Sequence, residues 1–138
     1  MGQMIMELWI CEMNPNNKIA MIFLVRNDIK MGKGKIAVNV GHATQYIIEE
    51  CLQRKYVTYV TWKKFYNSQK TALKVNSEKE FNELHSKLMD LSRKLHFPVK
   101  IVKDEQETHM HENMPIVVGF RPIKRNDVDY IIGDLKLL

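Results

Sequence analysis

Apolar and polar residues follow two different rhythms along this chain, and these predict strands and helices in turn. Residues 19–25 form an almost uninterrupted apolar run after the turn cluster at residues 14–17, a pattern typical of a strand buried on both faces. From Gly34 onward, apolar residues recur three and four positions apart, which predicts an amphipathic helix to about Arg54. That stripe consists of Ile36, Val40, Ala43, Ile47 and Cys51.

A second helix, strand and helix are predicted after this first helix. Residues 56–68 carry aromatic side chains at helical spacing, and residues 70–75 read as a short strand. Ser77 and Glu80 then form a capping box, in which the serine accepts a hydrogen bond from a free N–H and the glutamate reaches back. The helix that follows is defined by Phe81, Leu84, Leu88, Leu91 and Leu95.

The last third of the chain predicts two more strands and a short helix. Residues 99–102 and 115–120 read as strands, with Pro122 closing the second. Asn126 or Asp127 is expected to cap the short helix, and the tail at 135–138 to add an edge strand or pack on the sheet. Strands alternating with helices predict an α/β layered fold with a largely parallel or mixed sheet.

Composition is that of one ordinary globular domain. The chain has 138 residues, of which 45% are apolar and 27% charged. Twenty-one basic against 16 acidic residues give a net charge of +5, which mildly favours a polyanionic partner such as nucleic acid. We expect a single domain over residues 18–138, preceded by an extension of unknown role at residues 1–17.

The two cysteines, Cys11 and Cys51, have neither the number nor the spacing of a disulfide framework or a zinc knuckle. They are interpreted as reduced thiols, which predicts a cytoplasmic protein. The apolar first thirteen residues lack the features of a signal peptide and are too short to span a bilayer, so no membrane association is expected.

The first chemically suggestive stretch joins the first strand to the first helix and reads RNDIKMGKGK over residues 26–35. Glycines such as Gly32 and Gly34 allow close approach of the backbone to a ligand, and N–H groups at a helix start attract anions. The spacing is not that of a P-loop, and Ile36 stands where Ser or Thr would hold magnesium. A solvated basic turn is the alternative, but the carboxyl end of a strand favours a ligand site.

A second suggestive stretch begins at Asp104, directly after a predicted strand. If this strand and the first are neighbours and parallel, Asp104 and Lys35 come within reach as a general base and an electrostatic stabiliser. A surface salt bridge is the alternative. His109 and His111 have no third metal ligand at a recognisable spacing, so solvated histidines are favoured and no metal is expected.

Two further features have a structural and a functional interpretation. His42 lies toward the polar border of the first helix, where a packed, hydrogen-bonded histidine is favoured over a catalytic one. The aromatic stripe around Trp62, interleaved with Lys63 and Lys64, could stack nucleic-acid bases, but a core role is favoured.

Several motifs, in this order, resemble the type-2 peptidyl-tRNA hydrolases of archaea and eukaryotes. They are VRNDIKMGKGKIA, GHA, the strand-terminal Asp104 with Thr108 four residues on, VVGFRP and the closing GDLKLL. The resemblance covers about residues 19–138. It implies a three-layer α/β/α fold around a mixed four-stranded sheet, often dimeric, and hydrolysis of the ester joining a peptide to the 3′ end of tRNA without a cofactor.

The resemblance also implies a functional set of Lys35, Asp104 and Thr108. In our interpretation, Asp104 positions or deprotonates the attacking water, Lys35 stabilises developing oxyanion charge, and Thr108 hydrogen-bonds water or ester. Candidate supporting residues are Asn39, His42 and His109. Candidate tRNA-binding residues are Lys30, Gly32, Lys33, Gly34, Lys63 and Lys64.

The loop after Asp104 departs from the family pattern D-A-G-R-T-Q-I-A-P-G-S/T. Glu107 and Glu112 place carboxylates near an anionic substrate, and Met114 and Ile116 replace two hydroxyl residues. The other departures are Glu105, Gln106, His109 and Asn113. Repulsion of tRNA phosphate would be partly screened at physiological salt. The alternative to an active hydrolase is therefore a divergent tRNA-binding or protein-interaction module that keeps the fold and has lost turnover.

Overall fold

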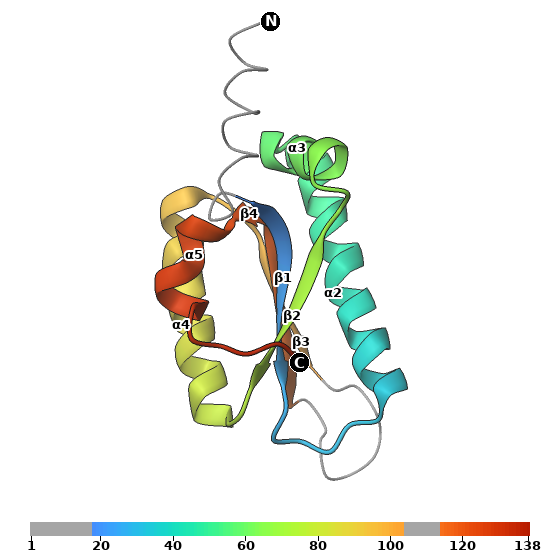
Figure 1. The fold of residues 1–138 in the computed structure, drawn as a ribbon, viewed down its shortest axis with the longest axis vertical. Coiled ribbons are helices and arrows are strands. Elements are labelled where there is room, and N and C mark those ends of the chain that lie inside the picture. The colour runs from blue at the N-terminus through green and yellow to red at the C-terminus, as the bar shows by residue number, and fades with distance from the viewer. Residues whose placement is uncertain (1–17, 104–113) are drawn as a thin grey trace, which may run out of the picture.

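The computed structural model describes residues 18–103 and 114–138. These two segments contain four strands and four helices, in the order β1-α2-α3-β2-α4-β3-β4-α5 (Figure 1). The strands are β1 (Ile19–Arg26), β2 (Lys70–Val75), β3 (Val99–Lys103) and β4 (Pro115–Lys124). The helices are α2 (Lys33–Arg54), α3 (Val57–Phe65), α4 (Glu78–Leu95) and α5 (Arg125–Ile132).

The strands form one mixed sheet in the order β2-β1-β4-β3. β1 pairs with β2 in parallel, whereas β4 is antiparallel to both β1 and β3. β1 is central in this sheet, and its apolar residues 19–25 are all buried, as predicted; Arg26, which ends the strand, is buried as well. The expected mixed, four-stranded sheet is confirmed.

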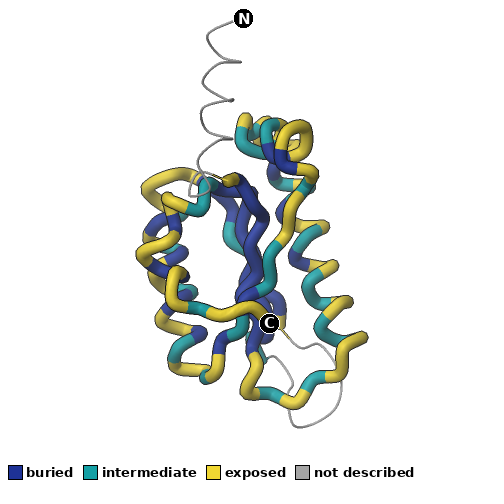
Figure 2. Tube along the Cα trace, viewed as in Figure 1, coloured by how far each residue is buried: buried dark blue, intermediate teal, exposed yellow. Residues whose placement is uncertain are grey.

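Helices cover both faces of the sheet, so the chain folds in three layers (Figure 1). Alternate residues of β1 point to opposite faces: Ile22 and Leu24 join the cluster under α4 and α5, and Met21 and Phe23 join the cluster under α2. Figure 2 shows the strands buried between helices whose outer faces are exposed. The expected α/β/α architecture is confirmed. No helix in the described segments is long and apolar enough to cross a membrane.

The two long helices follow their apolar stripes. In α2, Ala43, Ile47 and Cys51 are buried. In α4, the buried side chains are Phe81, Leu84, Leu88 and Leu91. At the start of α4, Ser77 Oγ accepts a hydrogen bond from the Glu80 N–H at 3.1 Å, so the serine half of the predicted capping box is confirmed.

Pro122 does not end the last strand, contrary to the prediction, because β4 continues to Lys124. Two features make a proline acceptable there. The register with β1 shifts between Ala20 and Ile22, opposite this part of β4, and the pairing with β3 does not extend past Phe120. The proline therefore occupies a position where the sheet requires no N–H donor.

The ends of the two short helices also differ from the predictions. Neither Asn126 nor Asp127 caps α5; Lys124 is the N-cap, with no side-chain capping hydrogen bond, and the N–H of Arg125 donates to the carbonyl of Lys18 at 3.0 Å. α3 ends at Phe65, three residues early, because left-handed backbone at Asn67 and Ser68 cannot continue a helix.

The C-terminal tail pairs with the outer edge of β2, as one of the two predicted arrangements requires. Leu137 forms an isolated antiparallel bridge with Leu73. The N–H of Lys74 donates to the carbonyl of Lys136 at 2.9 Å, and the N–H of Leu138 donates to the carbonyl of Ala72 at 3.0 Å. This edge strand is thereby covered in part.

Candidate active site

The lysine turn, residues 27–32, connects the carboxyl end of β1 to the start of α2 (Figure 1). Lys30 and Lys33 are exposed, and Lys35 is half-buried in the first turn of the helix. The N–H of Asn27 donates to the carbonyl of Val75 at 2.8 Å, which ties the beginning of the turn to the end of β2. The turn is thus held at one end of the sheet.

The N-terminus of α2 has the character of an anion site. Gly32 is its N-cap and supplies no side-chain hydrogen bond, and no acidic residue lies in the first turn. The start of a helix presents N–H groups that can bind an anion, and the helix dipole adds positive potential there. A Cβ built at Gly32 or Gly34 would meet no atom of residues 18–103 and 114–138 within 4 Å, so this part of the molecule leaves the backbone open to approach.

The two strands that precede the suspected catalytic segments are parallel but not adjacent. β4 lies between β1 and β3, so of the two conditions for bringing Asp104 near Lys35, the parallel direction is met and direct adjacency is not. Their carboxyl ends nevertheless reach the same end of the sheet, because Val25 is opposite Val117 and Lys103 is opposite Pro115 on the shared partner β4. Both strand ends therefore flank the start of β4.

Asp104, Thr108, His109 and His111 lie outside the described residues. Their flanks are described: Lys103 ends β3, and Pro115 begins β4. Lys103 is exposed at the same sheet end as the lysine turn, and sequence reasoning missed it as a candidate for binding an anion. Its signal was a lysine at the carboxyl end of a strand, directly before Asp104.

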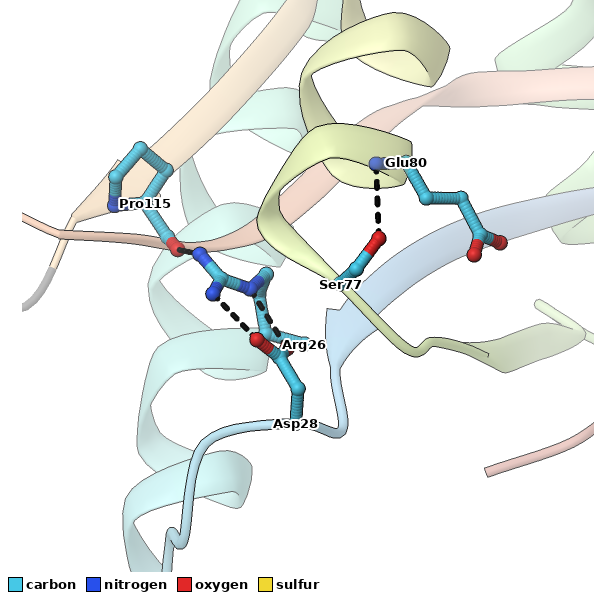
Figure 3. Close-up of polar contacts among 5 residues, drawn as sticks. All are labelled: Arg26, Asp28, Ser77, Glu80 and Pro115. Atoms are coloured by element: carbon cyan, nitrogen blue, oxygen red, sulfur yellow. Dashed lines mark hydrogen bonds and ion pairs between the residues drawn. The ribbon is translucent and has the colours of Figure 1, made fainter.

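A partly buried ion pair fastens the lysine turn to the sheet (Figure 3). Arg26, 3% exposed, donates from Nε to Asp28 Oδ1 at 2.8 Å and from Nη2 to Oδ2 at 2.6 Å. Its Nη1 donates to the carbonyl of Pro115 at 3.3 Å. The hydrogen bonds from Arg26 hold the pKa of the Asp28 carboxyl below its usual value. Sequence reasoning missed this pair as well.

The candidate supporting residues on α2 differ in their surroundings. Asn39 is half-buried, and its side-chain amide donates to the carbonyl of Lys35 at 2.9 Å, one turn earlier in the helix. His42 is exposed, so the favoured interpretation of a packed histidine is wrong. Asn39 therefore contacts the backbone of a suspected catalytic residue, whereas His42 faces solvent.

Lys63 and Lys64 lie far from the lysine turn. They are exposed in the last turn of α3, at the opposite end of α2 (Figure 1). The 22 residues of α2 give a helix about 33 Å long, so the two lysine groups are separated by roughly that distance. The structure brings Lys30, Lys33 and Lys35 together at one end and leaves Lys63 and Lys64 at the other.

The aromatic stripe of α3 contributes to the core through Trp62, which is buried and donates from Nε1 to the carbonyl of Gln69 at 2.7 Å. This confirms the core interpretation for the tryptophan. On the same side of the sheet, burial raises the pKa of Cys51 to about 11. Its thiol is free and buried, and is not a nucleophile at neutral pH.

No group of three His, Cys, Asp or Glu side chains in residues 18–103 and 114–138 gathers as a metal site would require. The groups available at this sheet end are instead cationic side chains and helix N–H donors. Such an arrangement binds and polarises an oxyanion, which is the requirement of phosphate recognition and of acyl-transfer chemistry. The fold and this sheet end define an α/β protein with a candidate anion-binding site at the carboxyl end of its central strand.

Comparison with known proteins identifies the class more closely. Residues 19–138 match the family model of peptidyl-tRNA hydrolase PTH2. A peptidyl-tRNA hydrolase of Staphylothermus marinus is 33% identical over 123 residues, covering 89% of this chain and 98% of the relative. Those of Saccharolobus solfataricus and Methanocaldococcus jannaschii are 34% and 36% identical, covering 87% and 86% of this chain and 99% and 98% of the relatives. The chain belongs to the PTH2 family of peptidyl-tRNA hydrolases.

Proposed function

We propose that this protein hydrolyses the ester bond between the peptide and the tRNA of peptidyl-tRNA, recycling tRNA from stalled or aborted translation. One observation carries the proposal: the cationic start of α2 lies at the same end of the sheet as Lys103 and Pro115. These two residues flank the segment that holds Asp104 in the sequence. Membership of the PTH2 family across residues 19–138 supports the same reaction.

Lys30 and Lys33 take the phosphates of the tRNA 3′ end, together with the N–H groups beside Gly32 and Gly34. Lys103 adds a further cation from the end of β3. Phosphate contacts fix position without reading sequence, which suits an enzyme that accepts many tRNAs. Lys63 and Lys64 serve a separate, more distant contact with the tRNA body.

Chemistry falls to Lys35, Asp104 and Thr108. Asp104 accepts a proton from water as the water oxygen attacks the ester carbonyl, and it returns this proton to the ribose oxygen of the tRNA as the bond between that oxygen and the carbonyl carbon breaks. Lys35 stabilises the negative charge that develops on the carbonyl oxygen, and Thr108 hydrogen-bonds the water or the ester. Asn39, His42 and His109 are supporting residues, and the reaction requires no metal or cofactor.

The test follows release of free tRNA from labelled peptidyl-tRNA. Lys35→Ala and Asp104→Asn are expected to lower kcat by about a hundredfold or more, since each removes charge stabilisation or general-base catalysis. Lys87→Ala, which removes an exposed lysine from α4, is the matched control and is expected to retain full activity. Wild-type turnover no faster than that of Asp104→Asn would overturn the proposal, and salt-sensitive tRNA binding without turnover would favour the inactive binding module.

We also propose that the protein acts in the cytoplasm as a homodimer, with residues 1–17 as an extension ahead of the family domain. Exposed apolar side chains on α2, Val38 and Leu52, each 58% exposed, support an interface between copies. Light scattering of the purified chain gives its mass in solution, and a monomer at micromolar concentration would contradict the dimer.

A further inference from the structure

We propose that Arg26 and Asp28 form a positioning pair that holds the lysine turn, which leads to Lys35, against Pro115 at the start of β4. The inference rests on the proposed function, because it concerns the geometry of the same site. Neither residue carries the reaction itself. Their role is to hold the lysine turn and the start of β4 in one fixed arrangement, so that groups from two distant parts of the chain act on the same ester.

An arginine at the end of β1 is unfavourable for stability alone. Arg26 closes a strand whose other residues are all apolar, and its side chain is almost fully buried. A buried charge is unfavourable unless its hydrogen bonds are satisfied, and an apolar side chain of similar volume usually stabilises a core as well or better. Burial therefore does not explain why this position holds an arginine. The directions of the hydrogen bonds that the arginine donates do explain it.

The guanidinium of Arg26 joins two segments that are distant in the chain. Two of its nitrogens bind both oxygens of Asp28, within the lysine turn, and the third donates to the carbonyl of Pro115. Pro115 is the first residue of β4 and stands 89 positions away in the chain. Figure 3 shows Arg26 between Asp28 and Pro115. One planar group thus connects the turn before Lys35 to the strand that begins after the Asp104 segment.

A third contact restrains the same guanidinium group. The guanidinium carbon lies 5.9 Å from the centre of the Phe81 ring, in the first turn of α4, so an aromatic side chain also restrains the arginine. An arginine fork presents its donors in a fixed plane, whereas a lysine carries a single mobile ammonium. Arg26→Lys therefore keeps the positive charge but removes the planar set of donors that joins Asp28 to Pro115.

The experiment measures kcat and KM for peptidyl-tRNA in Arg26→Lys, Asp28→Asn and the double variant. Each single substitution is expected to lower kcat by about tenfold or more and to change KM by less than about twofold, because the reacting groups are misplaced while phosphate contacts remain. The double variant is expected to cost little more than either single one, since the two residues act as a unit. Arg125→Lys makes the same replacement in the Arg125–Asp129 pair on α5, at the opposite sheet end, and is expected to leave kcat unchanged.

Assays are run below the melting temperature of each variant, with circular dichroism and binding of deacylated tRNA as measures of folded protein. If Arg26→Lys does not fold, Asp28→Asn decides by the same criteria, because its side chain is 28% exposed and the replacement has the same shape. Unchanged kcat in a folded variant, or an increase in KM at constant kcat, would overturn the positioning role. Absence of turnover in the wild-type protein would instead refute the proposed function, so the two failures are distinguishable.

Discussion

At the scale of single residues, Asp28 couples folding to pH. Hydrogen bonds from Arg26 lower the pKa of its carboxyl in the folded chain relative to the unfolded chain. A lowered folded-state pKa means that the stabilisation is complete above the unfolded value, about 3.9, and is lost as pH falls through the folded value. The pair is therefore expected to be intact throughout the neutral range and to weaken only in acid.

This predicts a pH-dependent difference between wild type and Asp28→Asn. The variant is expected to be less stable at about pH 6 to 7, and the gap in unfolding free energy is expected to shrink below about pH 4. Urea unfolding of both proteins at several pH values measures this difference in unfolding free energy. Asp129→Asn is the control, because it breaks an arginine pair whose carboxylate side chain is 57% exposed, and such pairs contribute only about 0.2–1 kcal/mol. A gap that stays constant down to about pH 2.5 would contradict the prediction.

How far single residues could be predicted depends on the range of their contacts. The burial of Trp62 follows from its neighbours along one helix, and that interpretation is confirmed. The role of Arg26 depends on the carbonyl of Pro115, which only strand pairing brings near, so no local pattern indicates it. Asp104 and Thr108 lie outside the described residues and remain predictions from the resemblance.

At the scale of elements, the packing of α2 on the sheet requires a glycine in β4. A Cβ at Gly119 would lie 3.1 Å from two ring carbons of Phe23 and 3.3 Å from the Cβ of Ala43. Phe23 and Ala43 are both buried, so neither has free space to move into. The absence of a side chain lets α2 approach the sheet, and thereby places the helix start that carries Lys35.

Gly119→Ala is accordingly expected to lower the unfolding free energy by about 1–3 kcal/mol, as overpacking of a core does. The matched control is Gly41→Ala on α2, where no atom of the described part of the chain lies within 4 Å of a built Cβ. That substitution is expected to stabilise by about 0.5–1 kcal/mol, because alanine favours a helix interior over glycine. Urea denaturation compares the two, and equal effects of the same sign would show that α2 does not depend on Gly119 for its close packing.

Elements with a strong periodic pattern were predicted closely, and their ends less so. The strand at 70–75 and the helices α2 and α4 agree with the structure, because each buries one regular stripe. The error at Pro122 arose because a proline usually ends a strand, whereas the register shift with β1 and the end of the pairing with β3 at Phe120 make a proline acceptable here. The start of α5 was not predicted because it depends on a backbone contact between distant segments, the hydrogen bond from the N–H of Arg125 to the carbonyl of Lys18.

At the scale of the whole molecule, the strand order decides which residues share a site. Sequence pattern indicates a mixed α/β sheet but contains no information on the insertion of β4 between β1 and β3, which depends on long-range pairing. The length of α2 separates the lysines of the proposed tRNA contacts into two groups, one near each end of this helix. At physiological salt the screening length is about 8 Å, so groups roughly 33 Å apart act on different phosphates.

Substrate length therefore separates the two groups. Lys30→Ala is expected to weaken binding of full-length peptidyl-tRNA and of a short peptidyl oligonucleotide that carries only the 3′ end, since both place phosphates at the lysine turn. The double variant Lys63→Ala/Lys64→Ala is expected to weaken binding of the full-length substrate only, because a short substrate cannot reach α3. Its kcat is expected to stay unchanged. Removing one lysine–phosphate interaction lowers the salt slope of binding by about 0.7–0.9. Measurements of KM for both substrates from about 50 to 200 mM salt test these expectations. A double variant that weakens binding of both substrates equally, or of neither, would exclude a separate contact of Lys63 and Lys64 with the tRNA body.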